Sequence, residues 1–128
     1  MKICSACGIE KDESEFYMNS DKGRKFLRND CKPCLKLRQA AGRFNISIET
    51  LASMYAAQDY KCKICKKKCS TYDSLSIDHD HKCCPHSGKS CGQCVRGLLC
   101  ASCNHGLGNF QDDPYLLLEA VKYLGLEV

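Results

Sequence analysis

The residues of this chain best suited to chemistry are an acidic, histidine-rich run, Asp78-His79-Asp80-His81, and a later asparagine, Asn104. Asp78 and Asn104 carry hard oxygen atoms of the kind that Mg²⁺ or Mn²⁺ prefers as ligands. The imidazole of His79, with an ordinary pKa of about 6.5, can take a proton from water at neutral pH. A cation ligand beside a base is typical of a metal-dependent hydrolytic site.

The backbone around this run must be irregular if the two groups act together. Adjacent residues of a strand point to opposite faces, so Asp78 and His79 converge only where the strand bends. His81 would share the face of His79 and could contact a metal or an anionic substrate. A surface loop and a further zinc site are the alternative interpretations of the run.

Paired cysteines frame this region. Cys-x2-Cys pairs lie on both sides of it, and their spacing predicts one structural zinc site formed by Cys62, Cys65, Cys100 and Cys103. A second such site is expected near the start of the chain, formed by Cys4, Cys7, Cys31 and Cys34. Asn104 directly follows the last cysteine of the first set, so a zinc there would hold it close to the reactive run.

A third zinc site is expected in the link that follows the acidic run. Cys91 and Cys94 would bind with Cys83 or Cys84, and the fourth ligand would be one of Cys69, His81 or His86. If His81 were bound to zinc, it would be lost to catalysis.

Zinc is favoured over disulfides by the number and pattern of the cysteines. There are thirteen, an odd number, and eight of them form the four Cys-x2-Cys pairs of the first two sites. The first residues, Met-Lys-Ile-Cys-Ser, lack the apolar run of a signal peptide, and no stretch is long enough to span a membrane. We therefore expect a reducing, cytoplasmic setting; a secreted disulfide scaffold is the alternative.

Charge points to local rather than global attraction for nucleic acid. The formal net charge is +4, but two zinc sites with four thiolates each would cancel it. Basic residues gather at three places, and the candidates for phosphate contact are Arg24, Lys25, Lys61, Lys66, Lys67 and Arg96. A solvated surface is the alternative for the lysines, and an ion pair with Asp78 or Asp80 is the alternative for Arg96.

The expected fold class is a small α+β protein stapled by zinc, because the mean hydropathy is −0.37 and Trp is absent. Residues 1–44 would form a zinc ribbon with a turn at 21–24 and a linker helix over 35–43. Residues 45–128 would form a second domain. It would contain a helix capped by Ser47 that ends near 58–59, strands over 71–77 and 93–99, and a tight turn at 106–108. A last helix would begin at Asp113-Pro114 and stop at Gly125.

The order of these motifs resembles one family. Cys62-x2-Cys65, then Asp78-His79-Asp80-His81, then Val95-Arg96-Gly97-Leu98-Leu99-Cys100-x2-Cys103-Asn104 is similar to phage recombination endonuclease VII, within the HNH or ββα-metal nucleases. The resemblance covers roughly residues 47–124. It implies a β-hairpin and helix around one catalytic Mg²⁺ or Mn²⁺, with zinc outside the chemistry.

The resemblance also implies roles for single residues. Asp78 and Asn104 would bind the cation, His79 would be the general base, and His81 would be its partner in the active site. The substrate would be DNA, including branched recombination intermediates, and cleavage would leave 5′-phosphate and 3′-hydroxyl ends. A non-catalytic zinc module that binds nucleic acid or protein is the rival function.

Three features depart from the junction-resolving member of that family. It has an acidic residue where this chain has Leu107, and a longer helical C-terminal region that forms an intertwined dimer. The link at residues 83–94 is also expanded here. Two coordinated cuts normally need two active sites, so junction resolution and the choice between monomer and homodimer stay open.

Overall fold

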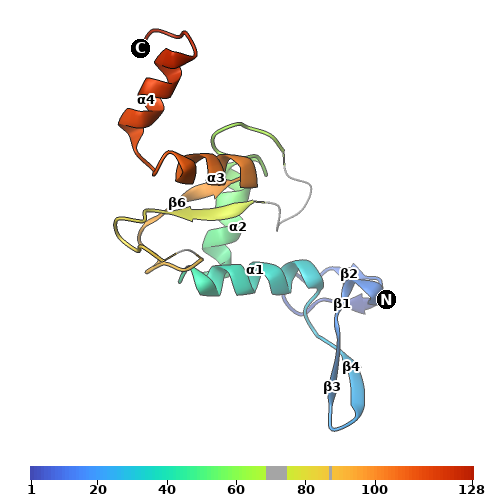
Figure 1. Cartoon of the computed structure of the whole chain (residues 1–128). Coiled ribbons are helices and arrows are strands. Elements are labelled where there is room, and N and C mark those ends of the chain that lie inside the picture. The colour runs from blue at the N-terminus through green and yellow to red at the C-terminus, as the bar shows by residue number, and fades with distance from the viewer. Residues whose placement is uncertain (69–74, 87) are drawn as a thin grey trace.

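Residues 1–30 fold as two small antiparallel hairpins around buried cysteines (Figure 1). Strand β1 (Lys2–Ile3) pairs with β2 (Glu10–Lys11), the 3₁₀ turn η1 (Glu13–Glu15) follows, and β3 (Met18–Asp21) pairs with β4 (Arg24–Leu27). The small buried core of this N-terminal unit consists of Cys4, Phe16 and Cys31. The computed structural model describes residues 1–68, 75–86 and 88–128.

The second hairpin projects away from the rest of the molecule (Figure 1). Its turn places Lys22 at φ 49° and Gly23 at φ 81°. A two-residue turn with both φ angles positive fits the twist of the two strands, and glycine adopts it without strain. The turn expected at residues 21–24 is therefore confirmed.

Helix α1 (Lys32–Arg43) joins this unit to the remainder of the chain. It begins three residues earlier than expected because the Cys31–Cys34 pair is itself part of its first turn, where Pro33 is well tolerated. At its other end Ala41 and the capping residue Phe44 are buried in the main core.

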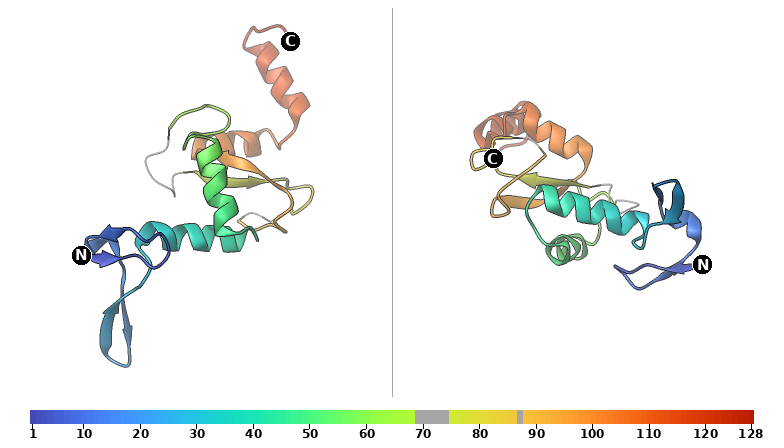
Figure 2. Two further views of the ribbon diagram at one scale, coloured as in Figure 1. Left: turned by 180° about the vertical axis from the view of Figure 1, so that it is seen from behind. Right: turned by 90° about the horizontal axis from the view of Figure 1, so that it is seen from below.

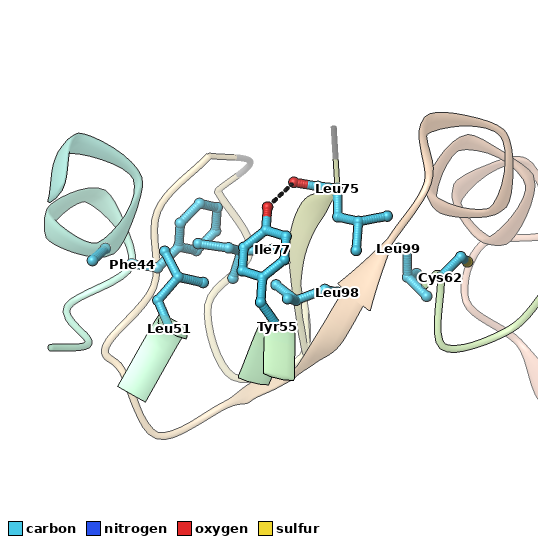
Figure 3. Packing of buried hydrophobic residues seen from close by; sticks show 9 residues of the cluster. Phe44, Leu51, Tyr55, Cys62, Leu75, Ile77, Leu98 and Leu99 are labelled. Carbon is cyan, nitrogen blue, oxygen red and sulfur yellow. Dashed lines mark hydrogen bonds between the residues drawn. The ribbon is translucent and has the colours of Figure 1, made fainter. Parts of the chain in front are cut away.

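The main core lies between α1, helix α2 (Ile48–Ala57) and one hairpin (Figure 3). Ser47 caps α2 by accepting a hydrogen bond from the Thr50 N–H at 3.0 Å, and α2 ends before Gln58, as the sequence predicted. Leu51 and Tyr55 point from α2 into the cluster, and the Tyr55 hydroxyl donates to the Leu75 carbonyl at 3.4 Å.

The hairpin pairs β5 (Ser76–His79) with β6 (Val95–Leu99) in antiparallel register, and helix α3 (Ala101–Asn109) follows directly. Both strands begin later than the expected starts at 71 and 93. Residues 71–74 of the first prediction lie outside the described residues. Ile77 and Leu98, which are paired across the hairpin, lie beside Tyr55 in the core, and Leu99 lies beside Cys62 (Figure 3).

The expected tight turn at residues 106–108 is wrong, because these residues lie within α3. The helix starts at the cysteine pair, where the Cys100 sulfur accepts a hydrogen bond from the Cys103 N–H at 3.4 Å. Once started, it continues through Gly106 and Gly108 to a cap at Phe110. Glycine weakens a helix but does not forbid it, so the glycine-rich pattern was a misleading signal.

Helix α4 (Pro114–Tyr123) extends from the end of the molecule opposite the N-terminal unit (Figures 1 and 2). Asp113 caps it through the N–H groups of Tyr115 and Leu116, and Gly125 follows it at φ +102°, as predicted. Leu116 and Leu124 of its apolar face are exposed. Among the described helices, none has the length and apolar character needed to cross a membrane.

Gln58 ties α2 to the hairpin in the manner of a neighbouring strand. Its side-chain amide donates to the Leu98 carbonyl at 2.9 Å and to the Lys61 carbonyl at 2.8 Å, and it accepts from the Leu98 N–H at 3.0 Å. The three bonds hold β6 in a fixed position relative to α2.

Replacing this amide should destabilise the hairpin. We expect Gln58→Ala to lower the free energy of unfolding by about 1–3 kcal/mol, because partly buried backbone groups of Leu98 lose their partner. Gln39→Ala, on an exposed helix position, is the matched control and should leave stability nearly unchanged. Urea denaturation of the metal-loaded protein measures the free energy of unfolding of both variants. Equal stability of the two would contradict a stabilising role for the Gln58 hydrogen bonds.

Candidate active site

A cavity of about 490 Å³ lies between α1, β5 and α3. Asp78, His79, His81 and Asn104 all line it, so the structure brings together the four residues singled out from the sequence. Asp78 and His79 are 7% and 3% exposed, whereas His81 is exposed. The buried pair therefore forms the floor of the cavity.

The hairpin contains an irregularity opposite Asp78 and His79, and the extra residue is Arg96 of β6. Asp78 pairs with Gly97 but His79 pairs with Val95, so the register shifts between these two neighbours. Such a bulge bends a strand and redirects a side chain. The hairpin is thus irregular at the point where Asp78 and His79 both line the cavity, and Asn104 reaches the cavity from the first turn of α3.

The ring of His79 is held on several sides. Its Nε2 atom lies 2.9 Å from the Cys84 carbonyl oxygen and 3.1 Å from that of His86. Phe44 lies against the ring at a centroid distance of 5.6 Å, and His81 at 4.4 Å. Because carbonyl oxygens only accept, Nε2 carries the proton in the neutral ring, and Nδ1 is left with the lone pair of a base.

Asp78 is engaged by Arg96 of the opposite strand. The Arg96 guanidinium donates through Nε to Oδ2 at 2.8 Å and through Nη2 to Oδ1 at 3.1 Å, and Nη2 also lies 3.4 Å from Asp112. The Asp78 carboxylate raises the pKa of Arg96. Of the two expectations for Arg96, the structure contains the ion pair with Asp78. A carboxylate has about four lone-pair sites, so this fork leaves room for a cation.

The link between β5 and β6 is hydrogen-bonded to the residues that connect α1 and α2. The Ser90 hydroxyl donates to the Phe44 carbonyl at 2.8 Å, and the Asn45 amide donates to the Ser90 carbonyl at 2.6 Å. Gly92, at φ +91°, passes so close to the Asn45 backbone that a Cβ atom would collide with it. These contacts fix the loop whose carbonyl groups hold His79.

Three groups of four cysteines have the arrangement of a metal site. Within each group the sulfur atoms lie within 4.8 Å of one another: Cys4, Cys7, Cys31 and Cys34; Cys62, Cys65, Cys100 and Cys103; Cys83, Cys84, Cys91 and Cys94. In two of the groups, sulfur–sulfur distances are 3.7 Å (Cys65–Cys100) and 3.8 Å (Cys83–Cys91). Zinc–sulfur bonds of about 2.3 Å in a tetrahedron place sulfurs about 3.8 Å apart, so the donor sets fit zinc.

The third group resolves the choice left open by the sequence. Cys83 and Cys84 both join Cys91 and Cys94, so the group offers four sulfur ligands where the sequence left Cys83 or Cys84 and the fourth ligand open. Neither His81 nor His86 belongs to the group, and Cys69 lies outside the described residues. Consecutive cysteines can supply two ligands here because the tight turn after Asp80 directs both sulfurs inward.

Backbone N–H groups support the thiolate form of the buried sulfurs. Burial raises the pKa of Cys4, but hydrogen bonds from the N–H groups of Cys31, Cys7 and Ala6 outweigh it and lower the pKa to about 6. The same balance lowers the pKa of Cys62 to about 6. Thiolates are the form that binds metal.

The basic residues predicted to contact nucleic acid lie on separate surfaces. Arg24 and Lys25 are exposed near the tip of the β3–β4 hairpin. Lys61 pairs with Asp59 at 3.4 Å, Lys66 donates to the Lys63 carbonyl at 2.7 Å, and Lys67 is exposed. They do not line the cavity.

The sequence interpretation missed the wall that α1 contributes. Lys36, Gln39 and Arg43 line the cavity opposite β5. The available signal was their spacing of three and four residues in a segment that contains no acidic residue.

Zinc content tests the cysteine groups. We expect three zinc ions per purified chain and two in the double variant Cys91→Ser/Cys94→Ser, because that variant loses half of one ligand set. Elemental analysis with thiol titration of the native protein measures this. Two zinc ions and five reactive thiols in the unsubstituted chain, Cys69 among them, would contradict a third metal site.

The tautomer of His79 can be observed directly. Nitrogen-15 NMR of the neutral imidazole should show the proton on Nε2 and an unprotonated Nδ1, because two carbonyl groups accept at Nε2. The exposed His105 is the internal control and should populate both tautomers. A proton on Nδ1 of His79 would contradict the hydrogen bonding.

Two phage proteins are similar to part of this chain. The Gene 59 protein of Mycobacterium phage D29 is 37% identical over 82 residues, which cover 63% of this chain and 44% of that protein. The Gene 59 protein of Mycobacterium phage L5 is 34% identical over 82 residues, which again cover 63% of this chain and 44% of that protein. This chain therefore spans less than half the length of these relatives.

A solved structure and a family model were also matched. The ββα-Me type II restriction endonuclease Hpy99I is similar with a TM-score of 0.38 and 30% identity, over 96% of this chain and 64% of that one. The family model for recombination endonuclease VII matches residues 37–125, which include Asp78, His79, His81 and Asn104, strands β5 and β6, and α3. The chain thus belongs to the recombination endonuclease VII family.

Proposed function

We propose that this chain is a metal-dependent DNA endonuclease that hydrolyses phosphodiester bonds, with His79 as the general base. The observation that carries the proposal is the convergence of Asp78, His79 and Asn104 on one cavity, at the register shift between β5 and β6. Family membership supports the reaction class. A module that only bound nucleic acid would need neither the bulge nor the oriented imidazole.

In the proposed reaction, Nδ1 of His79 accepts a proton from the attacking water. The water oxygen bonds to phosphorus as the bond to the 3′ oxygen breaks, which leaves a 5′-phosphate, and the departing oxygen gains a proton to become a 3′-hydroxyl. Carbonyl groups at Nε2 stabilise the imidazolium that forms, because both protonated nitrogens then have acceptors in reach or in solvent. His81, stacked on His79, would contribute to the same site.

Oxygen atoms of Asp78 and Asn104 would hold the cation. A bound Mg²⁺ or Mn²⁺ supplies positive charge for the phosphate and the leaving oxygen. Arg96 already shares its charge between Asp78 and Asp112, so it would set the orientation of the Asp78 carboxylate and could reach a phosphate at the rim.

We further propose that residues 1–44 form a zinc ribbon and linker helix and that residues 45–128 form the nuclease domain with its ββα-metal core. In this arrangement zinc supports the fold at the cysteine groups. The hairpin tip with Arg24 and Lys25, together with Lys61, Lys66 and Lys67, would contact the DNA backbone.

Removal of the base should abolish cleavage. We expect His79→Ala to lower the cleavage rate by about 10²–10⁴-fold, the usual contribution of a general base, and Asn104→Ala and Asp78→Ala to weaken it strongly. Matched junction, duplex and single-stranded DNA in Mg²⁺ and Mn²⁺ are the substrates, and His105→Ala is the control that keeps an exposed histidine change on α3.

Cleavage at the unsubstituted rate by His79→Ala would refute the mechanism. Binding of all three substrates without a cut in either cation would favour the rival, a non-catalytic module. The assay also reports whether a branched junction is preferred over plain duplex, which bears on recombination intermediates.

A further inference from the structure

Helix α1 presents a basic face to the cavity that contains Asp78 and His79. Lys36, Gln39 and Arg43, with Ala40 between them, line that wall. Residues three and four apart lie on one side of a helix, so these positions form a single stripe. The whole helix carries four basic residues and no acidic one.

The other two cations of α1 are occupied elsewhere. Arg38 forms an ion pair with Asp30 at 2.7 Å, and the Lys32 ammonium lies 5.0 Å from the centre of the Tyr17 ring. Within the described ranges, no carboxylate forms an ion pair with Arg43. Among the described residues, the charge of Arg43 at the cavity wall is therefore not paired with an acidic group, and Asp78 is engaged by Arg96.

The wall is rigid relative to the reactive residues. Ala41 is buried in the main core, and Phe44 at the end of α1 lies against the His79 ring. The Asp30–Arg38 ion pair ties the middle of the helix to the residues that precede it. With a rise of about 1.5 Å per residue, Lys36 and Arg43 are separated by roughly 10 Å along the axis. DNA carries one phosphate per 3.4 Å of axis on each strand, so the stripe could follow more than one phosphate.

The net charge makes a local patch necessary. The formal charge is +4, and three zinc sites with four thiolates each would bring the chain to about −2. A polyanion would then be repelled on average and drawn only to local positive surfaces. The α1 stripe is such a surface directly at the cavity.

We infer that this face of α1 binds the phosphates that flank the scissile bond on the cleaved strand, with Lys36 and Arg43 as charged contacts and Gln39 as a neutral donor. These are positioning residues, because they act on the substrate backbone beside the reacting phosphate. The inference rests on the proposed nuclease function and adds the path of the DNA strand. Such contacts place the substrate without reading its sequence.

Salt dependence of binding tests the assignment. In the His79→Ala background, which removes cleavage, anisotropy of a labelled duplex should show weaker binding in Lys36→Gln and Arg43→Gln by roughly tenfold each. The slope of log K against log salt should fall by about 0.9 for each lost contact. Lys122→Gln on α4 is the control and should leave both affinity and slope unchanged. Arg43→Lys keeps the positive charge and should retain the slope of the parent protein.

A second measurement locates the contact and guards against misfolding. Uncharged methylphosphonates beside the scissile bond should weaken binding of the parent protein but cause no further loss in the double variant Lys36→Gln/Arg43→Gln. The inference would be overturned if the methylphosphonates weakened binding equally in the parent protein and the double variant, or if the slope of log K against log salt did not change. Cleavage by the unsubstituted chain would in that case still support the nuclease function. Absence of both binding and cleavage in the unsubstituted chain would overturn both.

Discussion

The close approach of four sulfur atoms at three places is the constraint on which the structure depends. The apolar clusters are small, and the N-terminal core contains two cysteines and one phenylalanine among its buried residues. Metal bound at such sites supplies folding free energy that a sparse core cannot. One group joins α3 to the chain before the hairpin, and another closes the link between the strands. Both therefore hold the walls of one cavity.

Structural and reactive parts meet at His79. Cys84 belongs to a cysteine group, and its carbonyl oxygen accepts from the imidazole at 2.9 Å. The same loop is anchored through Ser90 to the end of α1, whose capping ring packs on His79. The expanded link at residues 83–94, which looked from the sequence like an interruption, is thus the support of the proposed base. Preorganisation of this kind is what a catalytic group requires.

Local chemistry made much of the fold predictable, and long-range contacts did not. Ser47 and Asp113 were readable as helix caps because their side chains bond to nearby N–H groups. The need for an irregular strand followed from the alternation of side chains at Asp78 and His79. The helix through Gly106 was missed because its start depends on a cysteine cap and on packing, and the pairing of Cys83 with Cys84 depends on a turn. The wall that α1 contributes to the cavity was missed because the contact between α1 and β5 is a tertiary one, which local sequence patterns do not show.

The central claim is that Asp78 and Asn104 hold one catalytic cation beside His79. Crystals grown with Mn²⁺ and a DNA substrate, in the cleavage-impaired His79→Ala protein, would locate the ion by anomalous diffraction. The account predicts one manganese peak within bonding distance of an Asp78 carboxylate oxygen and the Asn104 side-chain oxygen, with a DNA phosphate completing the site. Manganese bound to other residues at a DNA phosphate, with Asp78 still held only by Arg96, would contradict it.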